Sequence, residues 1–126
     1  MDLVDFIRAR LDEDEQAAAH EPSGRRIHPA DLQWEYQPDG DPDVPGGDVI
    51  ARDHRIVMDL PQVVAAHIAR HDPARVLREV EAKRRLLQAH LGYYGPGEDE
   101  GWPVPTPTLL ALPYADHKDY REDWRP

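Results

Sequence analysis

The feature that most constrains the fold is a stop and restart of helix at Asp72-Pro73. Proline fits the first turn of a helix but not its interior, and aspartate is a strong N-cap. The pair therefore ends one helix, which opens at Pro61, and starts a longer one over roughly residues 73–91. The apolar stripe of this third helix comprises Val76, Leu77, Val80, Leu87 and Leu91. The other segments are short or rich in Gly and Pro, so we expect them to pack on this helix pair.

A first amphipathic helix is predicted over residues 2–19, with Asp2 as its N-cap. Its apolar side carries Leu3, Val4, Ile7, Leu11 and Ala18, and its polar side mostly Arg8, Arg10, Asp12, Glu13 and Glu15. The acidic run at residues 12–15 is expected to face water or to pair with the basic third helix. A docking face for a basic partner is the alternative.

The middle of the chain has the pattern of strands. Leu32, Trp34 and Tyr36 alternate with polar residues, which predicts a half-buried strand over residues 32–37. Two further strands, residues 48–52 and 55–59, flank a tight turn at Asp53-His54. Residues 38–47 and 92–105 are predicted loops, and Thr106-Pro107 caps and starts a short helix that ends at Pro113. The predicted class is α+β: three main helices packed on a small antiparallel three-stranded sheet, with long Pro/Gly-rich loops, in a single domain over residues 1–126.

Composition excludes several classes of function. The formal charge of -10 opposes binding along a phosphate backbone, which disfavours a nucleic-acid partner. The absence of Cys excludes disulfides, thiolate zinc sites and Cys nucleophiles. Ser23, the only serine, lies in a Gly/Pro loop, and no phosphate-binding loop occurs. No leader and no stretch of about 20 apolar residues is present, so we expect a cytoplasmic protein without membrane contact.

These exclusions favour a small acidic protein-binding or regulatory module over an enzyme, with no cofactor and another protein, possibly a second copy, as its partner. The predicted interaction surface combines Arg75, Arg78 and Arg85 of the third helix with Tyr120 and Trp124 of the tail. Tyr120 and Trp124 are four residues apart, so they could anchor one helical turn against the body.

The alternative function is binding of zinc or another divalent metal, possibly in a metal-dependent enzyme. His67 and His71 lie four residues apart on a predicted helix, so both imidazoles could bind one ion. His90, His117 or Asp116 could supply a third ligand. The competing interpretation is structural. The two rings share a face with Val63, Val64 and Ile68, and that face is expected to be partly buried against the third helix or the sheet.

Two long strings resemble a family of small uncharacterised actinobacterial proteins known as domain of unknown function 6221. They are HIARHDPARVLREVEAKRR at residues 67–85 and LPYADHKDYREDWRP at residues 112–126, and the N-terminal helix beginning Asp2-Leu-Val fits as well. The resemblance implies no established activity. Many family members carry Cys residues in the loop after the third helix, one of them where this chain has Thr106. Any zinc role that depends on those thiolates is therefore not implied for this chain.

Overall fold

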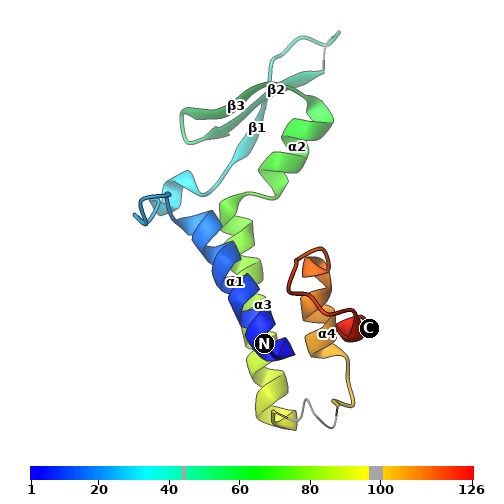
Figure 1. The fold of residues 1–126 in the computed structure, drawn as a ribbon. Coiled ribbons are helices and arrows are strands. Elements are labelled where there is room, and N and C mark those ends of the chain that lie inside the picture. The colour runs from blue at the N-terminus through cyan, green and yellow to red at the C-terminus, as the bar shows by residue number, and fades with distance from the viewer. Residues whose placement is uncertain (44, 97–100) are drawn as a thin grey trace. The chain divides into compact units, whose positions relative to one another are not determined.

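The computed structural model describes residues 1–43, 45–96 and 101–126, and the chain forms two compact units (Figure 1). Unit 1 combines residues 1–14 with residues 79–126, and unit 2 comprises residues 15–78. Helices α1 (Leu3–Ala19) and α3 (Pro73–Tyr94) contribute to both units, because the division falls within each of them. The single domain expected from the chain length therefore stays a prediction.

In unit 1, the first part of α1 lies antiparallel to the last part of α3 (Figure 1). Asp2 caps α1 as predicted, since its carboxylate accepts a hydrogen bond from the backbone N–H of Asp5 at 2.8 Å. Arg84 and Asp12 form an ion pair at 2.7 Å, so the acidic run of the first helix pairs with the basic third helix. The buried apolar side chains of these helix segments are Leu3, Phe6, Ile7 and Leu11 from α1 and Val80 and Leu87 from α3.

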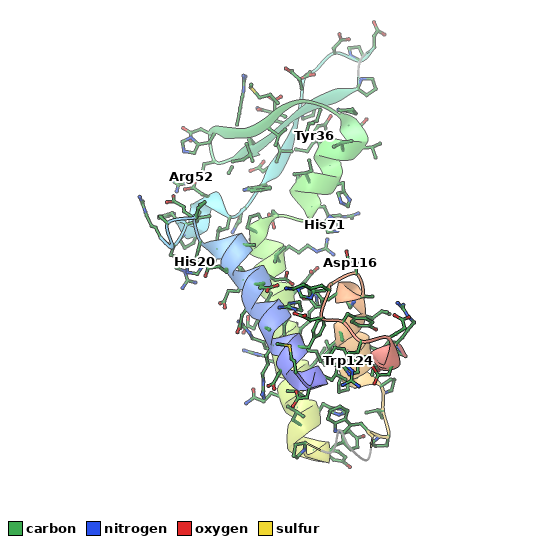
Figure 2. All side chains as sticks on the ribbon, in the orientation of Figure 1. His20, Tyr36, Arg52, His71, Asp116 and Trp124 are labelled. Carbon is green, nitrogen blue, oxygen red and sulfur yellow. The ribbon has the colours of Figure 1, made fainter. Side chains whose placement is uncertain are left out.

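The C-terminal segment surrounds Phe6 of α1 with rings and completes the core of unit 1. Phe6 has no exposed surface, and it contacts four rings at centroid distances of 5.1 to 6.5 Å: Tyr114, His117, Tyr120 and Trp124. Trp124, labelled in Figure 2, is buried and meets Tyr120 edge-on at 5.8 Å. Offset and edge-on geometries of this kind are the favourable ones for aromatic pairs. The tail thus lies against the body of the protein, as its aromatic residues predict.

Arg10 is buried in this core, and its predicted place on the polar side of α1 is wrong. Its guanidinium lies 5.0 Å from the centre of the Phe6 ring, donates from one nitrogen to Nδ1 of His117 at 3.0 Å, and pairs with Glu13 at 2.8 Å. Position 10 is four residues after Phe6 and so lies on the same side of the helix. A prediction that treats only apolar residues as buried misses an arginine whose guanidinium is hydrogen-bonded and ion-paired within the fold.

A second polar contact joins α1 to the C-terminal segment. The Tyr114 hydroxyl donates to the Asp14 carboxylate at 2.5 Å. Burial of the phenol, together with this bond to a negatively charged acceptor, raises the pKa of Tyr114 above its usual range. Tyr114 therefore stays protonated and keeps donating to Asp14 well above neutral pH.

The segment before the tail forms α4 (Thr106–Ala111), as predicted. Thr106 is the first helical residue and makes no cap, because Pro105 occupies the N-cap position. A short 3-10 helix, Leu112–Tyr114, follows directly. Residues 92–94, predicted as loop, extend α3 instead, and residues 97–100 of that predicted loop lie outside the described residues.

Unit 2 contains an antiparallel sheet of three strands in the order β1 (Glu35–Pro38), β2 (Gly46–Ala51) and β3 (His54–Pro61). The predicted α+β class is thereby confirmed. β1 begins three residues later than predicted, because the backbone N–H and carbonyl of Leu32 already form other hydrogen bonds. Its N–H bonds the carbonyl of Pro29 and closes the 3-10 helix Pro29–Asp31, while its carbonyl accepts from the N–H of Ala74.

The predicted hairpin exists, with its turn one residue earlier, at Arg52-Asp53. Arg52 adopts a positive φ of 55° there. The register pairs Val49 with Val57 and Ile50 with Arg55, which leaves Ile56 as an extra residue on β3. Such irregularities break the strict alternation of faces. As a result Ile56, Val57 and Met58 are all exposed.

Helix α2 (Gln62–Arg70) lies against one face of the sheet (Figure 1). Ala65 of α2 and Val49 of β2 are both fully buried, whereas Val63 is 81% exposed and Val64 is 43% exposed. The predicted burial of the face with Val63, Val64, His67, Ile68 and His71 is therefore wrong at every position except Ile68, which is half-buried. The small side of the helix, with Ala65 and the half-buried Ala69, packs inward instead.

The junction that the sequence singles out is confirmed. α2 ends at Arg70, and α3 begins at Pro73 with Asp72 as its cap. One carboxylate oxygen of Asp72 accepts from the backbone N–H of Arg75 at 2.8 Å, and the other accepts from the backbone N–H of Trp34 at 3.0 Å. Asp72 thus caps α3 and also fixes the position of Trp34, the residue directly before β1.

Candidate functional site

The His67/His71 pair lies exposed at the end of α2 in unit 2. The ring centroids are 4.4 Å apart at an interplanar angle of 33°, so the two imidazoles stack as residues four apart on a helix can. Nδ1 of His71 is 2.9 Å from the carbonyl oxygen of His67 and donates to it. In the neutral ring this bond leaves Nε2 of His71 with the free lone pair that a metal ligand needs.

The other proposed ligands, His90, His117 and Asp116, belong to unit 1. Nδ1 of His117 accepts from Arg10 at 3.0 Å and from the backbone N–H of Asp119 at 3.1 Å. This nitrogen is therefore already engaged in hydrogen bonds within unit 1. Asp116 is exposed and His90 is buried. Within the described residues, no group of three or more His, Cys, Asp or Glu side chains is arranged to hold a metal ion.

The five residues of the predicted interaction surface have different environments. Trp124 is buried and Tyr120 half-buried, and both pack on Phe6, so they belong to the core of unit 1. Arg78 is exposed in unit 2, where the half-buried Arg75 donates to the Arg70 carbonyl at 3.4 Å. Arg85 is exposed in unit 1 and pairs with Glu81 at 2.7 Å. The helical spacing of the three arginines indicated a basic stripe. It could not indicate that Tyr120 and Trp124 pack inside unit 1.

Unit 2 exposes a run of large apolar side chains that sequence reasoning missed, and we call this run the apolar patch. Five large apolar side chains within residues 56–64 are more than a third exposed: Ile56, Val57, Met58, Val63 and Val64. Three of them lie on β3, an edge strand whose outer backbone groups pair with no other strand of the described chain. The signal was present in the sequence. Three consecutive apolar residues in a strand cannot all face one core, and neither can two adjacent valines on a helix covering a narrow sheet.

His90 in unit 1 is a second unusual position. The side chain is 5% exposed, and neither ring nitrogen has a hydrogen-bond partner in the described ranges of the chain. Tyr94 and Trp102 pack against the ring at centroid distances of 4.9 and 5.0 Å. Burial lowers the pKa of His90 below its ordinary value of 6.5, so the imidazole is neutral at pH 7.

This pKa shift predicts a loss of stability in mild acid. The unfolded chain takes up a proton at position 90 at about pH 6.5, while the folded chain resists protonation until a lower pH. The contribution of His90 is therefore constant above about pH 6.5 and falls as the pH drops towards the folded pKa, by about 1.4 kcal/mol per unit of pKa depression. Urea midpoints measured from pH 8 to pH 5 check this. His90→Phe should flatten the profile, and an unchanged profile in that variant would contradict the assignment.

Helices that could cross a membrane are not found in the described part of the chain: none combines sufficient length with sufficient hydropathy. The family model of DUF6221, a family of unknown function, matches residues 1–126, and the chain therefore belongs to this family. No curated protein and no solved structure matches the chain.

Proposed function

We propose that this member of DUF6221 is a protein-binding module that uses the apolar patch of unit 2. The observation that supports the proposal is the concentration of five exposed apolar side chains on an edge strand and the helix that follows it. Single exposed apolar residues are normal, but a cluster of them marks an interaction site. An edge strand adds free backbone N–H and C=O groups, which an extended segment of a partner can pair with.

The surroundings of the patch suggest the chemistry of the partner. Asp39, Asp41 and Asp43 are exposed in the loop that precedes β2, and Gln62 at the start of α2 donates its backbone N–H to Pro45 of that loop at 3.4 Å. The acids therefore adjoin the end of the patch that carries Val63. A protein segment with apolar anchors flanked by Lys or Arg would complement this surface. A second copy is disfavoured as the partner, because two chains of formal charge -10 repel each other.

A peptide selection tests the proposal. Purified protein is used to select binders from a displayed library of extended peptides, and the enriched peptides are expected to combine apolar anchors with Lys or Arg. Val63→Asp should weaken their binding by about tenfold or more, because it places a charge within the apolar contact. Affinities measured by calorimetry or fluorescence anisotropy check this result.

Leu109→Asp is the matched control, since Leu109 is 51% exposed, carries an equivalent apolar-to-acid change and belongs to unit 1. It should bind the selected peptides as the wild type does. The free energies of unfolding of both variants should stay within about 0.5 kcal/mol of the wild-type value, as surface changes usually do. Enrichment of no peptide, or equal weakening by both variants, would refute the proposed function.

The stacked His67/His71 pair favours a second candidate function, the binding of a divalent transition metal ion. The two exposed imidazoles share one side of α2, and the bond from His71 Nδ1 to the His67 carbonyl fixes one ring with its Nε2 lone pair free. Two imidazoles four residues apart on a helix can chelate one zinc, copper or nickel ion, with water in the remaining positions.

The metal candidate predicts one bound ion per chain. Titration of untagged protein with Zn²⁺ should show a single site whose affinity drops by about tenfold or more in His71→Gln, because one of two ligands is lost. His54→Gln is the control, since His54 is an exposed histidine outside the pair. Binding should also weaken as the pH falls, because only the neutral ring binds metal. Identical titrations for wild type and His71→Gln would exclude the pair as a metal site.

A further inference from the structure

The feature that carries a further inference is the unsatisfied imidazole of His90 in unit 1. A neutral imidazole has one N–H donor and one lone-pair acceptor, and neither has a partner among the residues that the structure describes. Trp102 cannot supply one, because its indole N–H is already donated to the carbonyl of Gly95 at 3.1 Å. Buried polar groups in folded proteins are nearly always hydrogen-bonded, and an exception calls for a group that completes it.

A cavity adjoins the His90 ring. Its volume is about 410 Å³, within the usual range of small-molecule sites. Leu86, Ala89, Tyr93, Tyr94 and Val104 supply its apolar walls, and Thr106 supplies a hydroxyl. Among the described residues that line it, none carries a charged side chain. A ligand that suits these walls is neutral, flat and mostly apolar.

The exposure of the side chains around the cavity also favours a mostly apolar ligand. Leu86 is 54% exposed and Tyr93 is 82% exposed, which leaves apolar surface that a bound molecule would cover. The nitrogens of His90 are themselves covered, so a ligand reaches them only if a neighbouring ring moves. Tyr94 is the last residue of α3 and is 38% exposed, so its ring can swing out at low cost compared with a core residue.

We propose that the His90 cavity binds a small neutral aromatic molecule that carries one hydroxyl group, with the hydroxyl bonded to His90 and the ring against Tyr94. A phenolic hydroxyl both donates and accepts, so it fits either tautomer of the imidazole. The contact satisfies a buried polar group that otherwise has no partner, and the aromatic walls contribute offset or edge-on ring contacts. This site is separate in the sequence from the apolar patch, and it does not depend on the proposed protein-binding function.

The experiment compares phenol with toluene, which has nearly the same shape and lacks the hydroxyl. Wild-type protein titrated with phenol should show saturable shifts of the His90 ring signals in nitrogen-detected NMR, and phenol should bind about tenfold or more tightly than toluene. His90→Phe keeps a flat ring without nitrogens and should lose this preference. His54→Phe changes an exposed histidine outside the cavity and should keep it.

A second variant keeps the test decisive if His90→Phe does not fold. Tyr94→Ala opens the ring that covers His90 and should preserve the preference for phenol over toluene. The absence of saturable phenol binding, equal binding of phenol and toluene, or a preference that survives in folded His90→Phe would each overturn the assignment.

Discussion

Alanine at position 6 is expected to lower the free energy of unfolding by about 3–5 kcal/mol, the cost typical of a fully buried phenylalanine. Phe6 has no exposed surface and contacts four rings of the C-terminal segment and the guanidinium of Arg10. Its loss leaves a cavity and removes the anchor of the whole tail. Urea unfolding followed by tryptophan fluorescence measures the change, because Trp124 lies 5.1 Å from Phe6.

Leu109→Ala is the control for this prediction, since it removes an apolar side chain of unit 1 that is half exposed. It should change the free energy of unfolding by much less. A loss below about 1 kcal/mol in Phe6→Ala would show that the aromatic cluster does not hold the tail, and would contradict the role given to the C-terminal string.

The second large effect is expected at Asp72. Asp72→Ala should cost about 2–4 kcal/mol, because it removes the N-cap of α3 and also leaves the N–H of Trp34 without its acceptor. Asp72→Asn keeps one acceptor oxygen, so it can still cap the helix while the contact with Trp34 weakens. Its cost should lie between those of wild type and alanine.

Chemical denaturation of the three proteins at one pH checks this order. The cost of Asp72→Ala should exceed the value of about 1 kcal/mol that a lost cap alone usually has. A cost of only about 1 kcal/mol in Asp72→Ala, together with wild-type stability of Asp72→Asn, would mean that the link to Trp34 contributes nothing.

The parts of the fold that local rules decide were predictable. The caps at Asp2 and Asp72 and the helix starts that follow them depend on a few neighbouring residues, and they are confirmed. The class and the three strands follow from the change in apolar periodicity along the chain. Strand boundaries were less accurate, because the hydrogen bonds of Leu32 to Pro29 and Ala74 depend on the tertiary structure.

The side on which α2 is buried was not predictable, because the helix has two apolar sides. One carries Val63 and Val64, the other carries Ala65 and Ala69, and Ile68 lies between them. Hydrophobicity favours the valine side, but close packing on a narrow sheet is easier for alanines, which let the backbones approach. Arg10 shows the opposite error, since a charged residue is buried once Glu13 and His117 bond its guanidinium.

The candidate sites also divide into features that local residue spacing decides and features that the tertiary structure decides. The stacked arrangement of His67 and His71 follows from their spacing of four on a helix, and the structure shows it. The apolar patch and the unsatisfied His90 depend on which surfaces the fold leaves uncovered. The runs of apolar residues at 56–58 and 63–64 indicated that some of them would be exposed, but a single sequence has no direct record of which. The long C-terminal string, which looked like a surface for partners, supplies much of the core of unit 1.

We propose that unit 2 binds protein segments through the apolar patch. The aromatic tail has a different role and holds unit 1 together. The most direct test is an amide NMR titration of the whole chain with the tightest peptide from the selection. The largest shifts are expected on Ile56, Val57, Met58, Val63 and Val64, and Val63→Asp should weaken the peptide binding that causes them by about tenfold or more at an unchanged denaturant midpoint. Shifts confined to unit 1, for example around Tyr93 and Tyr120, would contradict it.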